Sequence, residues 1–120
     1  YKNSFDILKE ILSEIKDNKI YSFVSVLKSM GKKNDYLSFG FHGLTLVLDF
    51  PIYKNIYKTL DKIDNIVLIN NGRIYLTKDS RVNKGQFKKI NQEFNNAAFK
   101  KMRIKNKTFF SSLQSERLGI

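Results

Sequence analysis

Apolar and less apolar residues alternate through residues 44–50, and this alternation constrains the fold more than any other feature of the sequence. The strongly apolar positions are Leu44, Leu46, Leu48 and Phe50, and the positions between them are Thr45, Val47 and Asp49. Because successive side chains of a β-strand point to opposite faces, the pattern predicts a strand with one buried face. Pro51 has no backbone N–H for a sheet ladder, so the strand should end there. The chain is therefore expected to form a sheet that other elements cover on one side.

The residues on both sides of this strand predict further strands and helices. We expect helices over residues 5–15, 55–69 and about 83–103, and strands over residues 21–28 and 73–78. The expected caps are Asn3 or Ser4 for the first helix, Asn71-Gly72 as a left-handed stop for the second, and Asn83 with Gln86 as a capping box for the third. Beyond residue 103 the pattern suggests only a helical turn around residues 112–118.

The order of these elements is helix, strand, strand, helix, strand, helix. This order predicts an α+β fold with an antiparallel sheet that has helices on one side, in an incomplete ferredoxin-like (split βαβ) layout. The layout lacks its first strand, so we expect a strand before Tyr1 in the parent protein. A chain without that strand leaves a sheet edge open, and an edge-strand dimer is one way to cover it.

Composition excludes several classes of site. The 120 residues suffice for one domain, and the chain has no cysteine and one histidine, His42, which excludes thiolate and multi-histidine metal sites. We therefore expect no metal. No apolar run approaches the ~18 residues of a membrane span, so a cytoplasmic or membrane-peripheral location is expected. The net charge is +2 over residues 1–72 and +9 over residues 73–120, so the basic surface belongs to the last part of the chain.

Two lysines end predicted strands and are candidates for chemistry. Lys78 follows Ile74 and Leu76 on one strand face, whereas Tyr75 would lie on the opposite face. The simplest interpretation is a solvated lysine, and the functional one is an ammonium that takes part in proton transfer at the mouth of a cleft. If Tyr75 and Lys78 line one pocket, the strand must twist, bulge or end between them. Lys28 ends the strand predicted over residues 21–28 in the same way.

Several segments together resemble the C-terminal region of a family of flavoenzymes. They are YSFVSVLKSMG at 21–31, GLTLVLDFP at 43–51, NGRIYLTKDSR at 71–81, and the terminal Phe110, Ser112, Arg117 and Leu118. The pattern is similar to FAD-dependent oxidoreductases of the vanillyl-alcohol-oxidase and p-cresol-methylhydroxylase superfamily, especially decaprenylphosphoryl-ribose oxidases and the aldonolactone and alditol oxidases. The resemblance implies a fragment of a two-domain enzyme. Residues 1–72 would belong to the substrate-binding (cap) domain and residues 73–120 to a segment returning to the FAD-binding domain.

The resemblance also implies roles for particular residues. In that family a sugar or polyol hydroxyl is oxidised by hydride transfer to flavin, and the FAD is held mainly by a domain outside this chain. Lys78 would be the catalytic residue, in contact with both hydroxyl and flavin, and Tyr75 would line the same cofactor and substrate pocket. Lys28 would meet a polar or phosphate-bearing part of the substrate. Thr45 and Val47 would also contact the substrate, although decaprenylphosphoryl-ribose oxidases have an asparagine and a cysteine at these positions. The fragment alone is expected to be inactive, and the electron acceptor stays open.

One alternative uses the basic charge of residues 73–120 instead. A ferredoxin-like module without enzymatic activity could bind nucleic acid through these cations or dimerise through its sheet edge. Against nucleic-acid binding, the less apolar face of the central strand offers Thr45, Val47 and Asp49 instead of the aromatic residues that stack on RNA bases. The flavoenzyme hypothesis, with no nucleic-acid partner, is therefore preferred.

Overall fold

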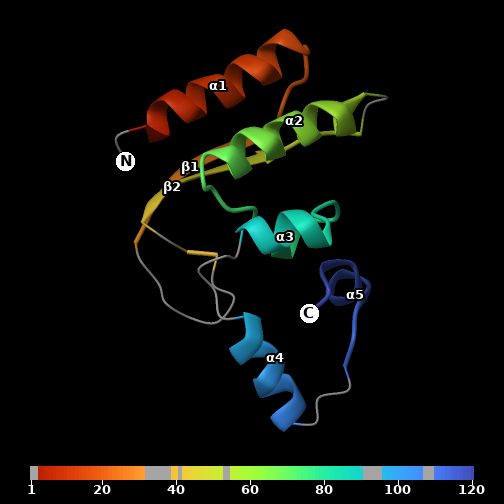
Figure 1. Cartoon of the computed structure of the whole chain (residues 1–120). Coiled ribbons are helices and arrows are strands. Elements are labelled where there is room, and N and C mark those ends of the chain that lie inside the picture. Colours follow the sequence, from red (N-terminus) through yellow and green to blue (C-terminus); the bar gives the residue numbers. More distant parts are fainter. Residues whose placement is uncertain (1–2, 32–38, 41, 53–54, 91–95, 107–109) are drawn as a thin grey trace. The chain divides into compact units, whose positions relative to one another are not determined.

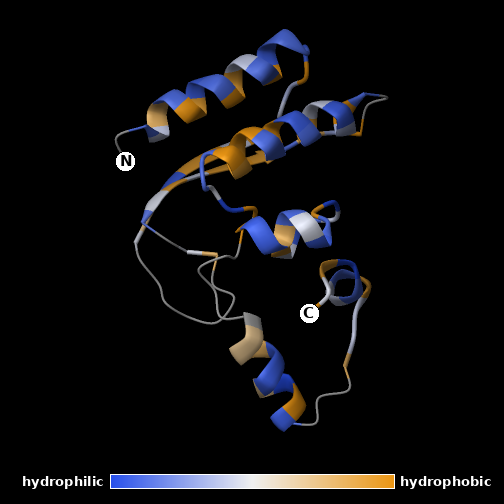
Figure 2. Ribbon diagram, viewed as in Figure 1, coloured by the Kyte–Doolittle hydropathy of each residue, from blue (hydrophilic) through white to orange (hydrophobic). Residues whose placement is uncertain are grey.

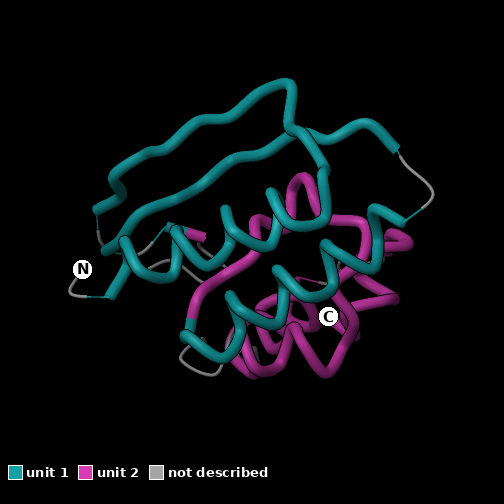
Figure 3. The backbone as a smooth tube through the Cα atoms, turned by 90° about the horizontal axis from the view of Figure 1, so that it is seen from above, with its two compact units in different colours: residues 1–33, 40–71 teal, residues 34–39, 72–120 magenta. Residues whose placement is uncertain are grey.

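The computed structural model describes residues 3–31, 39–40, 42–52, 55–90, 96–106 and 110–120 (Figure 1). These residues form an α+β fold with two antiparallel strands and five α-helices. The chain divides into two compact units (Figure 3): unit 1 comprises residues 1–33 and 40–71, and unit 2 comprises residues 34–39 and 72–120. The predicted fold class is therefore confirmed, and each unit is described below by itself.

The strands of unit 1 form an antiparallel pair. Strand β1 (Val24–Met30) pairs with β2 (Gly43–Asp49), so that Lys28 lies opposite Thr45. The strand predicted over residues 21–28 is present but starts three residues later than expected. At this end of the ladder the Ser22 hydroxyl bonds to the backbone of Asp49. It accepts the Asp49 N–H at 3.0 Å and donates to the Asp49 carbonyl at 2.9 Å.

Two helices cover one side of the strand pair. Helix α1 (Ser4–Asp17) and helix α2 (Ile56–Ile69) lie on the same side of β1 and β2 (Figure 3). The core they form consists of buried Ile11, Ile15, Ile20 and Ile56, against which Leu46, Leu48 and Phe50 pack. Figure 2 shows the apolar residues along both strands and at intervals along the helices. The apolar face predicted from the alternation at 44–50 is therefore the face that the helices cover.

A polar contact joins these two helices, and a left-handed residue ends the second. Lys62 of α2 donates to the Glu14 carboxylate of α1 at 2.6 Å, and this hydrogen bond lowers the pKa of Glu14 below its ordinary value. Asn71 has a φ of 56°, which confirms the left-handed stop predicted after α2.

The third strand, predicted over residues 73–78, is wrong. Tyr75 has extended backbone, but residues Leu76–Lys78 form a 3₁₀ helix, η1. The Lys78 N–H donates to the Tyr75 carbonyl and the Asp79 N–H to the Leu76 carbonyl, each at 3.2 Å. Backbone groups that a strand would offer to a neighbour are thus satisfied inside a turn, and within the described residues the sheet has two strands.

Unit 2 consists of short helices around a small core. They are α3 (Lys84–Ile90), α4 (Asn96–Lys105) and α5 (Leu113–Leu118), and the buried residues are Val82, Phe87 and Leu118. The predicted capping box is confirmed, because Asn83 and Gln86 exchange bonds at 2.9 and 3.0 Å. The helical turn predicted around residues 112–118 is confirmed as α5. The helix predicted over 83–103 is present as α3 and α4, and residues 91–95 lie outside the described part.

No helix in the described ranges combines the length and apolarity that crossing a membrane requires.

We expect Ile11→Ala to lower the free energy of unfolding of the chain by about 2–4 kcal/mol, because it leaves a cavity in the core of unit 1. Ile11 is 6% exposed, whereas its neighbour Leu12 is 50% exposed. Leu12→Ala is therefore the matched control and should cost about 1 kcal/mol or less. Urea unfolding followed by circular dichroism measures both. Equal losses for the two variants would contradict this description of the core.

Candidate functional site

Tyr75 and Lys78 lie in one tight turn of unit 2, called here the lysine turn (residues 75–78). Both side chains are exposed, Tyr75 to 46%. The ring of Phe39, which also belongs to unit 2, lies 5.0 Å from the Tyr75 ring, measured between centroids, with the planes tilted by 56°. This tilted arrangement is a favourable aromatic contact and limits the positions open to the Tyr75 phenol.

The turn changes how Tyr75 and Lys78 lie relative to each other. A strand would have pointed Tyr75 and Lys78 to opposite faces, and one pocket could hold both only if the strand ended between them. The chain does leave extended conformation at Tyr75 and enters the 3₁₀ helix. The Lys78 N–H donates to the Tyr75 carbonyl at 3.2 Å, so these two residues begin and end one hydrogen-bonded turn. The structure therefore places both predicted site residues in the same turn.

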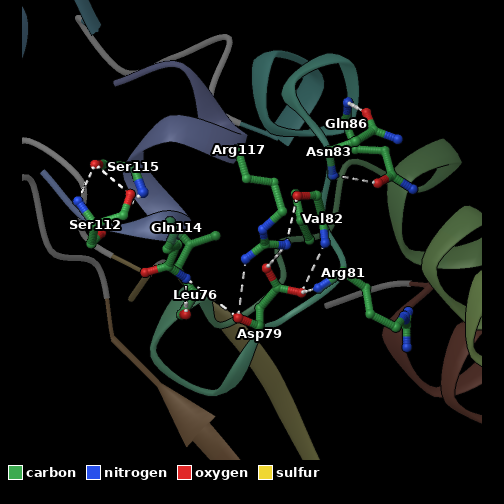
Figure 4. Close-up of polar contacts among 10 residues, drawn as sticks. All are labelled: Leu76, Asp79, Arg81, Val82, Asn83, Gln86, Ser112, Gln114, Ser115 and Arg117. Atoms are coloured by element: carbon green, nitrogen blue, oxygen red, sulfur yellow. Dashed lines mark hydrogen bonds and ion pairs between the residues drawn. The ribbon is translucent and has the colours of Figure 1, made fainter.

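The backbone just after the lysine turn folds around the carboxylate of Asp79. Its Oδ1 accepts the N–H of Arg81 at 2.8 Å and the N–H of Val82 at 2.9 Å (Figure 4). The Asp79 side chain is only 6% exposed. An ionised carboxylate this deeply buried requires several hydrogen bonds, and these two N–H groups supply part of them.

Two side chains of α5 donate further hydrogen bonds to this segment, and one of them, Arg117, reaches the Asp79 carboxylate. Arg117 donates to Asp79 Oδ2 at 3.1 Å, to the Val82 carbonyl at 2.8 Å and to the Asp79 carbonyl at 3.3 Å. Gln114, one turn earlier on α5, donates to the Leu76 carbonyl and, at 3.4 Å, to the Asp79 carbonyl (Figure 4). Helix α5 therefore holds the backbone on both sides of Lys78 through charge-assisted and neutral hydrogen bonds.

Unit 1 brings together the other three predicted site residues. Lys28 lies directly opposite Thr45 in the ladder, and Val47 is two residues further along β2. Opposite residues of an antiparallel pair share a face, as do residues two apart on one strand. That face is the one turned away from the helices, because Leu46 and Leu48 occupy the core face. Lys28 is exposed there, and Thr45 and Val47 are half-buried. A cation beside a hydroxyl and a methyl-bearing surface can bind a polar, anionic group.

Sequence reasoning gave no role to three residues that support the lysine turn: Asp79, Gln114 and Arg117. A partial signal existed for Asp79, because an aspartate after an apolar run tends to accept backbone N–H bonds from the residues that follow it. The spacing of Gln114 and Arg117, three apart, also places them on one face of any helix. Among the described residues no three His, Cys, Asp or Glu side chains are grouped to hold a metal ion.

Comparison with known proteins gives a partial match to an oxidase. The chain is 38% identical over 74 residues to decaprenylphosphoryl-β-D-ribose oxidase of Mycolicibacterium smegmatis. The match covers 61% of this chain but 16% of the relative, so the chain spans a small part of that enzyme's length. No protein-family model matches the chain. The chain thus has an oxidase among its relatives.

We expect Asp79→Ala to lower the free energy of unfolding of unit 2 by about 3 kcal/mol, because it removes the carboxylate that pairs with the half-buried Arg117 and accepts the Arg81 and Val82 N–H groups. The side chain of Asp6, which pairs with Lys9 across one turn of α1, is 76% exposed. Asp6→Ala should therefore cost about 1 kcal/mol or less. Hydrogen exchange of the α5 amides under native conditions reports unit 2 separately. Unchanged protection of α5 in Asp79→Ala would contradict the arrangement described here.

Proposed function

We propose that the chain is the C-terminal part of an FAD-dependent oxidoreductase that oxidises a hydroxyl group of a sugar or polyol. The observation that carries this proposal is the lysine turn, which presents an exposed amine and an exposed phenol on backbone that buried polar contacts hold in place. The oxidase relative supports the same reaction class. The sequence resemblance supports a flavin as the cofactor and oxidation of the hydroxyl group as the reaction.

The side chains of the turn suit alcohol oxidation. Converting a CH–OH group to a carbonyl removes a hydride from carbon and a proton from oxygen. Lys78 either accepts that proton or stabilises the negative charge that develops on the oxygen. Tyr75 orients the substrate through its phenol, and its ring supplies a surface for a planar cofactor. These groups fit a flavin, which when bound accepts the hydride.

We further propose that Lys28, Thr45 and Val47 bind the substrate. The relative is named for decaprenylphosphoryl-β-D-ribose, a sugar linked to phosphate. A phosphate-bearing sugar suits the exposed ammonium of Lys28, which lies beside the Thr45 hydroxyl on the outer face of β1 and β2. Val47 contributes apolar surface. Which sugar is bound depends on contacts beyond these three residues.

The division of the chain supports a corresponding domain assignment. We assign residues 1–72 to the end of a substrate-binding domain and residues 73–120 to a segment that returns to the FAD-binding domain. The boundary between the two compact units falls between Asn71 and Gly72, at the step in charge from +2 to +9. The basic segment would then lie in the domain that binds the anionic pyrophosphate of FAD.

Lys78→Ala in the complete protein should slow the bleaching of bound flavin by a sugar substrate about 10²- to 10⁴-fold, because it removes the proposed proton acceptor. Flavin content should stay close to wild type. Lys88→Ala, which removes an exposed lysine of α3, is the matched control and should leave the rate unchanged. Anaerobic rapid mixing with absorbance detection measures the rate. A Lys78→Ala enzyme as fast as wild type would exclude the catalytic role.

Lys28→Ala should weaken the binding of a phosphate-bearing sugar about 10- to 100-fold, because a hydrogen bond to a charged group is lost. Binding of the same sugar without phosphate should change little. Lys16→Ala, at the exposed end of α1, serves as the control. Equilibrium titration of the flavin spectrum gives the dissociation constants. If both sugars lose affinity equally, Lys28 does not recognise phosphate.

A further inference from the structure

The conformation of the lysine turn depends on side chains that are distant in the sequence. Arg117 and Asp79 are 38 positions apart, as are Gln114 and Leu76. The two hydrogen bonds inside the turn, at 3.2 Å each, are local and would hold a short 3₁₀ helix only weakly by themselves. Within the described residues the segment has no sheet neighbour. Contacts from α5 therefore account for much of its order.

The contacts from α5 lie on both sides of Lys78. Before it, the Leu76 carbonyl accepts a bond from Gln114. After it, the Asp79 carbonyl accepts one hydrogen bond from Arg117 and one from Gln114. The Asp79 carboxylate accepts another hydrogen bond from Arg117. The Lys78 backbone is thus fixed on either side while its side chain stays exposed. A catalytic amine needs this combination, since small displacements of a reacting group cost large factors in rate.

Helix α5 has anchors of its own that do not involve Gln114 or Arg117. Ser112 and Ser115 form a reciprocal capping box at its start, with bonds of 2.8 and 3.1 Å. Leu118, 2% exposed, lies in the core of unit 2 with Val82 and Phe87. Gly119 ends the helix with a φ of 72°. Replacing Gln114 or Arg117 therefore removes contacts to the turn while these anchors of the helix remain.

We propose that Arg117 and Gln114 are positioning residues for the oxidation: through Asp79 and the Leu76 carbonyl they set the location of the Lys78 amine. The inference rests on the proposed function of Lys78. It attributes the geometry of the site to two side chains of α5 that act through the backbone and carboxylate beside Lys78 instead of binding the substrate themselves. Substrate affinity should therefore be insensitive to these two residues, whereas the rate of the chemical step should depend on them.

The test uses the complete, flavin-loaded protein with Arg117→Ala, Arg117→Lys and Gln114→Ala. We expect Arg117→Ala to slow flavin bleaching at saturating sugar about 10- to 100-fold, with the dissociation constant of the sugar within about twofold of wild type. Arg117→Lys should recover part of the loss, because a lysine can still donate to the Asp79 carboxylate. Arg103→Ala is the matched control, since Arg103 also donates to a backbone carbonyl of unit 2, that of Phe110. It should behave as wild type.

A double variant separates positioning from general destabilisation. If Arg117 acts through Lys78, Arg117→Ala should have no further effect on the rate in a Lys78→Ala protein. Losses that multiply in the double variant would overturn the proposal, as would an Arg117→Ala enzyme with wild-type rate. Should Arg117→Ala fail to fold, Gln114→Ala, which removes neutral bonds only, carries the same expectations with a smaller loss.

Limited proteolysis tests the contacts without relying on activity. Trypsin should cleave after Lys78 and Arg81 faster in Gln114→Ala and Arg117→Ala than in wild type or Arg103→Ala, with the sites identified by mass spectrometry. Unchanged cleavage would overturn the proposed hold on the turn. If cleavage accelerates but no sugar bleaches the flavin of the wild-type protein, the proposed function has failed and the structural contact has not.

Discussion

The buried carboxylate of Asp79 is the group on which the candidate site depends most. Burying a carboxylate is costly unless hydrogen bonds and an opposite charge replace its water. Here two backbone N–H groups and the Arg117 guanidinium do so, and each of them comes from a defined place in unit 2. The chain from Asp79 to Val82 must therefore fold tightly around the carboxylate, and α5 must stay beside it. Lys78 is the residue immediately before this fixed point.

Local patterns in the sequence predicted the elements whose stability is itself local. The alternation at residues 44–50 gave β2 and its buried face, because a strand that packs on one side needs that period. Asn71 gave the end of α2, and the pair Asn83 and Gln86 gave the start of α3, because each cap is satisfied within four residues. The prediction of a third strand was wrong because a residue distant in the sequence determines the conformation there. Residues 73–78 have the composition of a strand, but Gln114, far along the chain, bonds to the Leu76 carbonyl in a turn instead.

The residues of the candidate site also differ in how far the sequence alone could predict their positions. The alternation at residues 44–50 placed Thr45 and Val47 on one strand face, but the register that sets Lys28 opposite Thr45 is known only from the structure. Tyr75 and Lys78 were predicted to share a pocket only if a strand twisted, bulged or ended between them. The structure has a 3₁₀ turn there instead of a strand, and both residues belong to this turn. Residues 73–120 contain twelve lysines and arginines and three acidic residues, so charge alone could not select Arg117 as the partner of Asp79. Only the folded structure shows that Arg117 is the cation that pairs with Asp79.

We have proposed that this chain is part of a flavin-dependent oxidase of sugars, with the amine of Lys78 at the reacting hydroxyl. The most direct measurement is an absorption spectrum of the complete purified protein, taken without oxygen before and after a phosphate-bearing sugar is added. We predict a bound flavin whose visible absorption the sugar abolishes and air restores. A colourless protein, above all one that binds RNA in a salt-dependent manner, would contradict the claim.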